Sequence, residues 1–291
     1  MKQSEKKLQG KIAFEKYYGD LYSERWQEIK NAFAKEILYA QLSAGENLEK
    51  YYLDAASLCA ALCLPLENVE KVADLCAAPG GKTLAIALSM NDDAKLFSNE
   101  KSAQRKSRLS KVVETCLPEN IKSRITTSCS DAATWCTRET ESFDAILLDA
   151  PCSSERHVYN DDKYLAQWTP SRIKNIATEQ WALLSSAFRL LKTNGFMIYA
   201  TCAMNETEND GTLSKLIKKF PNAKIMSFEK MKDTFCHNVE SFKAQISIRD
   251  NISLEEILMK AEKTKHGLHI LPDKAHNSGP LFFSLIQKIS C

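Results

Sequence analysis

Short apolar runs alternate along this chain with longer stretches in which apolar residues recur every three or four positions. The short runs are typical of buried strands, and the longer period is typical of amphipathic helices. Five runs of the first kind lie at residues 72–75, 94–100, 121–128, 143–149 and 195–202. Because helical periods separate them, the pattern predicts an α/β fold with a mostly parallel central sheet and helices on both faces.

The residues before the first strand are expected to form a small helical extension. Apolar side chains share one face of a helix over 24–38, with Ser23 as its N-cap. Residues 54–64 predict a second helix, which Pro65 ends, and residues 1–20 indicate a frayed arm or a short helix. We therefore predict an N-terminal helical extension over residues 1–70 and a sheet domain over residues 71–291.

The second half of the chain continues the alternation of helices and strands. A long helix is expected over 171–192, where Asn194-Gly195 ends it, and another over 205–220. Strands are expected over 223–228 and 279–288, the latter in a hairpin at the sheet edge.

Two segments depart from this alternation. Residues 152–170 are polar with aromatic residues among them, and a loop of this length predicts a functional lid. Residues 229–270 hold apolar patches and charges without a clean period, so no element is predicted there.

The first strand runs into a glycine turn and then into an apolar helix. A P-loop needs a glycine where this chain has Cys76, and the dinucleotide fingerprint Gly-x-Gly-x-x-Gly is absent. What remains is a tight turn in which Gly80 and Gly81 would let the backbone approach a ligand closely. The amides of the following helix N-terminus would favour a carboxylate.

Acidic and thiol side chains follow the predicted strands at their carboxyl ends. Glu100 ends the second strand, about where such sheets hold a ribose diol, and Asp131 and Asp149 end the next two. Cys152 follows Asp149 closely, and Cys202 ends the fifth strand. A lone cysteine is more often a buried structural thiol. Because the glycine turn and three acids are predicted at the same edge of the sheet, a reactive pair of cysteines is favoured here.

Composition narrows the class of protein. A hydrophobic content of 44% supports a substantial core, and 39 Lys and Arg residues nearly balance 37 Asp and Glu residues, so total charge does not indicate a partner. Ten cysteines follow a charged start without an apolar signal region, so we expect reduced thiols and a cytoplasmic location. The longest apolar run, 58–66, is too short to span a bilayer, so no membrane is expected.

No metal site is expected either. Cys59 and Cys63 have no paired cysteines or nearby histidine, so burial is the favoured interpretation. His266 and His269 lack carboxylate or cysteine neighbours at ligand spacing.

A basic helix is predicted directly after Glu100. Cations dominate it, and a solvated face is the simpler explanation, although one or two cations would also suit phosphates or a ligand carboxylate. Arg105 is the best candidate for such a contact. The other cations of this helix are Lys101, Lys106, Arg108 and Lys111.

Three motifs, taken together, resemble one family. Asp74–Thr83, Asp149–Ser153 and Thr201-Cys202 are similar in order and spacing to the RNA cytosine-5 methyltransferases with a Sun domain, of the NSUN and RsmB type. The resemblance spans about residues 20–290, and Ser153–His157 is closer to the branch with the mitochondrial ribosomal-RNA enzyme. It implies S-adenosylmethionine as cofactor and a class I, Rossmann-like methyltransferase fold, with 71–291 as the catalytic domain.

The resemblance also implies roles for single residues. Cys202 would be the nucleophile, Cys152 the thiol that resolves the adduct, and Asp149 would face both cofactor and target base. This chain departs from the usual residues of the family on either side of Thr-Cys, at Ala200 and Ala203, and neither change removes a reacting group. The implied cofactor residues are the backbone of Cys76, Ala77, Ala78, Pro79, Gly80 and Gly81 with Lys82 for the methionine part, Glu100 for the ribose, Asp131 for the adenine, and Arg105 beside the site.

The implied reaction explains why these groups are needed. Carbon 5 of cytosine is a poor nucleophile, so a thiolate must first add to carbon 6. An acid near N3, for which Asp149 is the candidate, would assist, and a base must then remove the carbon 5 proton. Single-stranded RNA with splayed bases is the expected partner, and both ribosomal and transfer RNA suit it.

Three other classes of protein can be compared with this chain by the sequence elements that each requires. DNA cytosine-5 methyltransferases carry their nucleophile in the Pro-Cys element and do not need Thr201-Cys202, so no DNA substrate is expected. Amino-group methyltransferases carry Asn/Asp-Pro-Pro-aromatic where this chain has Asp149–Cys152. A catalytically inactive RNA-binding or ribosome-assembly protein on the same fold stays open, and a monomer is expected in either case.

Overall fold

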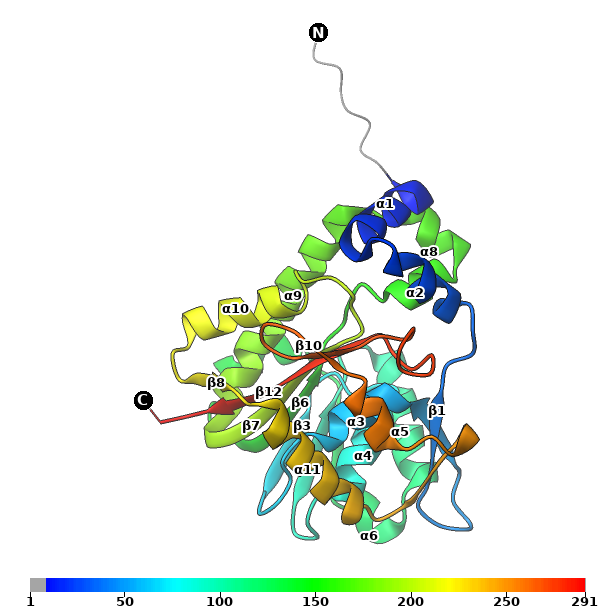
Figure 1. Ribbon diagram of the computed structural model, residues 1–291. Coiled ribbons are helices and arrows are strands. Elements are labelled where there is room, and N and C mark those ends of the chain that lie inside the picture. Colours follow the sequence, from blue (N-terminus) through cyan, green and yellow to red (C-terminus); the bar gives the residue numbers. More distant parts are fainter. Residues whose placement is uncertain (1–8, 291) are drawn as a thin grey trace.

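The computed structural model describes residues 9–290, and its centre is one nine-stranded sheet (Figure 1). Five strands of this sheet are parallel, in the spatial order β5-β4-β3-β6-β7. The predicted parallel sheet is therefore confirmed. The parallel strands are β3 (Lys71–Asp74), β4 (Lys95–Asn99), β5 (Ile125–Ser128), β6 (Phe143–Asp149) and β7 (Leu191–Thr201).

The sheet continues beyond β7 with antiparallel strands. β12 (Leu281–Lys288) pairs with β7 on one side, and with β11 (Leu268–Ile270) and β8 (Ala223–Ile225) on the other. β10 (Glu262–Lys263) completes this end. The prediction that the last strand forms a hairpin at the sheet edge is wrong in its placement, because β12 is buried along nearly its whole length and has neighbours on both sides.

Helices cover both faces of the sheet, as expected for a doubly wound fold. One face packs against α3 (Ala55–Leu62), α4 (Gly81–Ser89) and α5 (Ala103–Cys116), and the other against α9 (Pro170–Leu190) and α10 (Asp210–Lys219). Short helical elements elsewhere in the chain include α6 (Glu119–Lys122) and two 3-10 helices, Ala132–Thr137 and Arg249–Asn251.

Aromatic side chains form a third core between the N-terminal helices and the segment after Cys152. Figure 1 shows α1 (Gly10–Tyr22) and α2 (Arg25–Phe33) beside α8 (Asp162–Gln167), and α7 (Glu155–Tyr159) adjoins α8. The lid prediction for 152–170 is wrong in its conformation. Val158, Leu165 and Trp168 are buried against α1 and α2, so this segment is folded into the molecule.

The N-terminal extension contains strands that were not predicted. β1 (Tyr39–Ser43) pairs with β2 (Tyr51–Asp54) and with β9 (Gln245–Ile248), more than 200 residues later in the chain. The helix predicted through residue 38 therefore ends at Phe33, and its N-cap is Glu24 rather than the predicted Ser23. Residues 229–270 supply α11 (Phe228–Glu240), β9, α12 (Leu254–Met259), β10 and β11. The division of the chain at residue 70 stays a prediction. Across that boundary, α3 packs into the same hydrophobic core as α4.

Several predicted boundaries shift for identifiable reasons. α9 ends at Leu190, and Asn194-Gly195 lies inside β7 rather than at the helix end. A Cβ at Gly195 would lie 2.7 Å from the Asp144 carbonyl oxygen, so glycine is needed for the close approach of β6. α10 begins at Asp210 rather than near Asn205, because the side chains of the intervening residues make buried hydrogen bonds.

The helices of residues 9–290 include none that is both long enough and apolar enough to cross a bilayer.

Candidate active site

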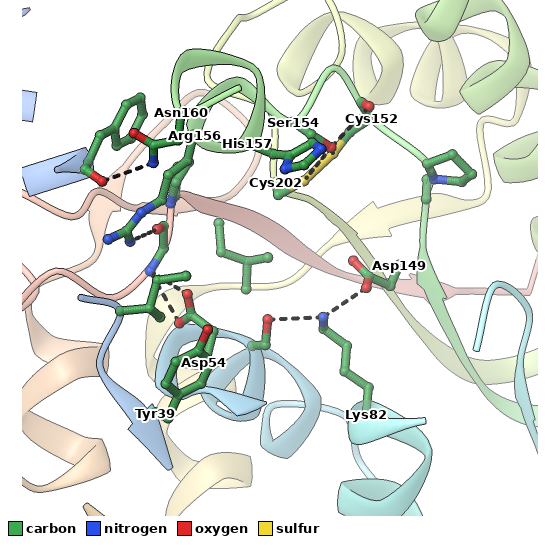
Figure 2. A pocket seen from close by; sticks show the side chains of 18 of the residues that line it. Tyr39, Asp54, Lys82, Asp149, Cys152, Ser154, Arg156, His157, Asn160 and Cys202 are labelled. Atoms are coloured by element: carbon green, nitrogen blue, oxygen red, sulfur yellow. Dashed lines mark hydrogen bonds and ion pairs between the residues drawn. A yellow bond between two sulfur atoms is a disulfide. The ribbon is translucent and has the colours of Figure 1, made fainter. Parts of the chain in front are cut away.

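A cavity of about 880 Å³ opens at the carboxyl ends of β3, β6 and β7 (Figure 2). Its walls come from seven parts of the chain: the residues from the end of α2 to β1, the start of α3, the glycine turn, α5, the end of β6 with the following segment, the end of β7, and the residues at the start of β12. The predicted site residues that line it are Cys76, Ala78, Lys82, Arg105, Asp149, Cys152 and Cys202. A smaller neighbouring cavity adds Ala77, Pro79 and Gly81.

The glycine turn packs tightly between β2 and α5. Gly80 has φ +123°, and a Cβ there would lie 2.9 Å from a methyl carbon of Val112. A Cβ at Gly81 would lie 2.7 Å from the Tyr51 ring. Both glycines are thus explained by packing against protein, which corrects the sequence-based reason that they make room for a ligand.

The side chain of Asp74 lies under the turn and is fully buried. Its Oδ2 accepts a hydrogen bond of 2.7 Å from the Thr83 hydroxyl. Burial raises the pKa of Asp74 to about 7, and the Asp149 carboxylate adds to this while Thr83 opposes it. Asp74 was not among the predicted site residues, although its place at the end of the first strand could have indicated it.

Lys82 joins the turn to the end of β6. Its ammonium lies 2.8 Å from Asp149 Oδ2 and donates to the Ser57 hydroxyl at 3.1 Å (Figure 2). The lysine side chain is largely buried and the aspartate partly so. Lys82, expected at the cofactor, thus contacts the acid expected to face the target base, and the two form one charged group on the cavity wall.

Glu100 is buried at the end of β4. Its Oε1 accepts from the Ser102 backbone amide at 3.0 Å. Arg105 Nη1 is 3.1 Å from Oε2 without hydrogen-bond alignment, so Oε2 is a buried oxygen with no hydrogen-bond partner within residues 9–290. Arg105 also donates to the Ala78 carbonyl at 2.7 Å, which ties α5 to the glycine turn.

Asp131 lies further out, beyond the end of β5. It caps the following 3-10 helix through the Ala133 amide at 3.1 Å and pairs with Lys101 at 2.7 Å. The hydrogen bond from Lys101 lowers the pKa of Asp131. Neither Glu100 nor Asp131 lines the two cavities described above, so the structure does not bring every predicted cofactor residue into one pocket.

The site nevertheless fits the cofactor class that the motifs imply. Glu100 Oε2 is a buried acceptor without a donor, and a ribose diol supplies two donors. The turn precedes the N-terminus of α4, where backbone amides favour a carboxylate. Asn99 holds the neighbouring strand ends together by donating to the carbonyls of Leu75 and Ser130.

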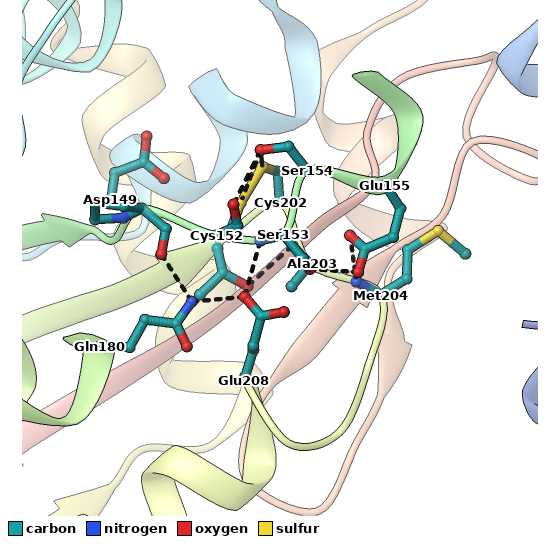
Figure 3. Close-up of a disulfide and its surroundings, with 12 residues drawn as sticks. Asp149, Cys152, Ser153, Ser154, Glu155, Gln180, Cys202, Ala203, Met204 and Glu208 are labelled. Atoms are coloured by element: carbon teal, nitrogen blue, oxygen red, sulfur yellow. Dashed lines mark hydrogen bonds between the residues drawn. A yellow bond between two sulfur atoms is a disulfide. The ribbon is translucent and has the colours of Figure 1, made fainter. Parts of the chain in front are cut away.

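Cys152 and Cys202 come together across the ends of two adjacent parallel strands. Their Cα atoms are 6.2 Å apart, and the two sulfur atoms are joined as a disulfide (Figure 3). Reduced thiols were expected, and for this pair the structure differs, because pairing of β6 with β7 brings both strand ends to one place. The other seven cysteines of the described chain are free, and Cys59 and Cys63 are buried as predicted.

A buried polar network supports this pair from behind (Figure 3). Glu208 accepts from the Ser153 amide at 3.0 Å and from the Asn205 side chain at 2.7 Å. Glu155 accepts from the Asn205 side chain at 3.2 Å, and from the hydroxyls of Ser153 and Tyr18. Burial raises the pKa of Glu155, with a further contribution from the Glu208 carboxylate. The motifs did not reveal this network, since its members are polar residues without regular spacing.

The basic helix predicted after Glu100 is α5 with the residues before it. Lys101 and Arg105 are engaged in the ion pairs described above. Lys106, Arg108 and Lys111 form no ion pair with any residue of the described chain, and Arg108 and Lys111 are exposed. This surface therefore keeps cations free for an external anion.

No group of three or more His, Cys, Asp or Glu side chains within residues 9–290 is arranged to hold a metal ion.

Solved structures show the class of fold. The chain superposes on a structure titled "Crystal Structure of PH0851" with a TM-score of 0.72 and 18% identity, covering 94% of this chain and 65% of that one. A methyltransferase homologue from Pyrococcus horikoshii gives a TM-score of 0.66 at 19% identity, over 95% and 94% of the two chains. The fold is therefore that of a class I methyltransferase, as predicted.

Sequence comparison identifies the family. Residues 61–286 match the family described as "16S rRNA methyltransferase RsmB/F", and the chain belongs to it. This family depends on S-adenosylmethionine, so the predicted resemblance and cofactor class are confirmed.

Two relatives illustrate the range within the family. Ribosomal RNA small subunit methyltransferase F of Vibrio campbellii is 37% identical over 187 residues, which are 64% of this chain and 38% of that protein. A mitochondrial tRNA (cytosine(34)-C(5))-methyltransferase of Danio rerio is 29% identical over 250 residues, 83% of this chain and 62% of that protein. The chain thus spans between about a third and two thirds of the length of such relatives.

Proposed function

We propose that this chain methylates carbon 5 of a cytosine in ribosomal or transfer RNA. The observation that carries the proposal is the meeting of Cys152 and Cys202, fifty residues apart in sequence, in one cavity with Asp149 and the glycine turn. Two thiols beside an acid and a cofactor turn suit addition to a pyrimidine ring followed by release. The names of the relatives, which include ribosomal and transfer RNA enzymes, support the same substrate class.

S-adenosylmethionine would be held by the turn Cys76–Gly81, by Glu100 at the ribose and by Asp131 towards the adenine. When bound, it supplies an electrophilic methyl group for carbon 5. Glu100 Oε2 is near Arg105 but accepts no hydrogen bond within residues 9–290, which supports its assignment. Asp131 is assigned to the adenine only because of its position after β5. Its ion pair with Lys101 would have to open or rearrange to admit a ligand.

The side chains of this protein would carry the steps at the base. The reduced thiolate of Cys202 adds to carbon 6, which makes carbon 5 nucleophilic. Once carbon 5 carries the methyl group, Cys152, as a thiolate, takes the proton from that carbon, the carbon–sulfur bond at carbon 6 breaks, and Cys202 leaves as a thiolate. Asp149, held by Lys82, would contact the polar edge of the base. Reduction of the Cys152–Cys202 pair is a precondition for this chemistry.

The RNA would reach the cavity across α5, where Arg108 and Lys111 present unpaired cations. Other properties of the working protein stay predictions: a monomer, in the cytoplasm, acting on RNA and not on DNA. Size-exclusion chromatography with light scattering would test the first of these, and fractionation of cells that express the protein would test the second.

Trapping experiments with cysteine variants test the mechanism most directly. Cys202→Ala should abolish methylation and form no covalent RNA complex. Cys152→Ala should accumulate an RNase-sensitive complex on a denaturing gel, because the adduct forms but is not resolved, and Cys152→Ala with Cys202→Ala should lose it. Cys129→Ala, at an exposed free cysteine, serves as the control.

The outcomes separate the candidate functions. Trapping in Cys202→Ala instead of Cys152→Ala would exchange the two roles. An RNA-binding parent protein that neither methylates nor traps any RNA under reducing conditions would favour the alternative of a catalytically inactive RNA-binding or assembly protein.

A further inference from the structure

The residue after Ser153, Ser154, has an unusual backbone conformation. Its φ and ψ are 55° and 54°, in the left-handed region that favours glycine. A serine there costs of order 1 kcal/mol relative to glycine, so its retention needs a local cause. The contacts of the Ser154 hydroxyl, and the hydrogen bonds that hold the residues on either side, supply such a cause.

The hydroxyl of Ser154 lies beside both cysteine sulfurs, at nearly equal distances from the two. Its oxygen is 3.4 Å from Cys202 Sγ and 3.5 Å from Cys152 Sγ (Figures 2 and 3). It also donates to the Cys152 carbonyl at 3.3 Å. A hydroxyl has one proton to donate, so three acceptors compete for it, and an anionic sulfur is a stronger acceptor than a neutral carbonyl.

Both neighbours of Ser154 are fixed by the buried network. The Ser153 amide donates to Glu208 at 3.0 Å, and Glu155 accepts from the Met204 amide at 3.2 Å. Ser153, Glu155 and Glu208 are fully buried. Because these contacts hold the chain on both sides, the backbone of Ser154 keeps its left-handed conformation, and its short side chain is directed at the sulfurs.

We infer that Ser154 is a further catalytic residue, whose hydroxyl donates a hydrogen bond to whichever of Cys202 and Cys152 is the thiolate. Before addition the acceptor is Cys202, and its attacking form is stabilised. Once Cys202 is bonded to carbon 6, Cys152 becomes the acceptor while it acts as the base. The inference rests on the proposed function for its catalytic meaning, but the hydrogen bond itself can be measured without RNA.

The test measures the reactivity of each cysteine in the fully reduced protein. Iodoacetamide is added at a series of pH values, and modification of Cys202 and Cys152 is followed separately by peptide mass spectrometry. Ser154→Ala removes the hydroxyl and keeps the Cβ, whereas Ser154→Gly removes the hydroxyl and relieves the backbone. Losing a hydrogen bond to a thiolate should move the half-maximal pH of Cys202 alkylation up by about one unit in both variants.

A matched control separates backbone relief from loss of the hydroxyl. Ser23 is exposed and also has a positive φ, 52°, and its hydroxyl makes no hydrogen bond to either cysteine in the described chain, so Ser23→Gly should leave the alkylation profile unchanged. A parent-like profile in Ser154→Ala or in Ser154→Gly would overturn the inference, because both lack the hydroxyl. Circular dichroism and urea unfolding confirm that each variant is folded.

Methylation assays then distinguish this inference from the proposed function. If both hold, Ser154→Ala and Ser154→Gly lose about tenfold in turnover, the fold-change that matches one unit in the thiolate equilibrium. A shifted alkylation profile together with a parent protein that methylates no RNA would overturn the proposed function and the catalytic role, while leaving the hydrogen bond established. An unshifted profile with an active parent would overturn only the role of Ser154.

Discussion

The cofactor edge of the sheet and its cysteine edge are built in different ways. At the cofactor edge, comprising Asp74, the turn 76–82, Glu100 and Asp131, the acids are held by near neighbours in sequence: Glu100 by Ser102 and Asp74 by Thr83. At the cysteine edge, comprising 152–155 and 202–208, Glu155 accepts from Tyr18, 137 residues away. The acids Asp74 and Glu100 are thus held by local contacts, whereas the cysteine edge depends on docking of the N-terminal helix α1.

This difference indicates how each edge responds to change. A substitution at the cofactor edge should alter ligand affinity with little effect on the fold, because few distant groups depend on it. At the cysteine edge, removal of one network residue leaves several buried donors without acceptors, so stability and catalysis should fall together.

Breaking the network should have the largest effect. Glu155→Ala leaves the hydroxyls of Tyr18 and Ser153 and the Met204 amide without their acceptor, and we expect a loss of about 3–4 kcal/mol in the free energy of unfolding. Urea denaturation followed by circular dichroism measures it. Glu155→Gln, which keeps an acceptor oxygen, should lose less, and Glu46→Ala, at an exposed position, should be close to neutral. Equal stability of Glu155→Ala and the parent would refute the contrast between the two edges.

At the cofactor edge, Glu100→Ala should cost about 2–3 kcal/mol in affinity for S-adenosylmethionine, because a charged pair of hydrogen bonds to the ribose is lost. Isothermal titration calorimetry measures the dissociation constant. Exposed Glu139 provides the control, Glu139→Ala. Unchanged affinity in a folded Glu100→Ala protein would remove Glu100 from the cofactor site.

Asp74 should give the cofactor edge a signature in the pH dependence of stability. Its pKa of about 7 is raised from an ordinary 3.8, so between these values the folded state holds a proton that the unfolded state releases. Stability contributed by the protonated form is therefore lost as pH rises from about 4 to 7. Relative to Asp74→Asn, the parent should lose about 2 kcal/mol over this range in urea titrations.

The comparison with Asp74→Asn cancels titrations shared by both proteins. Burial lowers the pKa of His269 to about 4, which reduces stability as pH falls below its ordinary value. This opposite trend is common to parent and variant. Parallel stability curves for the two proteins would contradict the raised pKa of Asp74.

The smallest effect is expected on the surface next to the cofactor edge. Charge reversal of Lys106 and Arg108 should weaken RNA binding about tenfold at low salt and reduce the salt slope, while cofactor affinity is spared. Fluorescence anisotropy at several salt concentrations measures both. Reversal of exposed Lys218 and Lys219 on α10 is the control, and identical salt slopes for both double variants would make α5 a merely solvated face.

The local sequence pattern was sufficient to predict most strands of the sheet and the acidic and thiol residues at its edge. Most of the parallel strands contain short apolar runs, and Glu100, Asp149 and Cys202 stand at their carboxyl ends, so their meeting at one edge follows from parallel pairing. The pattern failed where burial comes from distant partners. β1 is a strand because β9 pairs with it, and the helices α7 and α8 are held in place because Val158 and Leu165 are buried against α1 and α2.

The amino-acid sequence by itself determined the order of the elements, the turn and the two cysteines, because periodicity and motif spacing are properties of neighbouring residues. Only the tertiary structure decided what surrounds the cysteines. The left-handed Ser154, the buried acids Glu155 and Glu208, and the pairing of Lys82 with Asp149 arise from segments far apart in the chain. Burial and hydrogen bonding between such segments depend on how the whole molecule packs, and no local pattern encodes them.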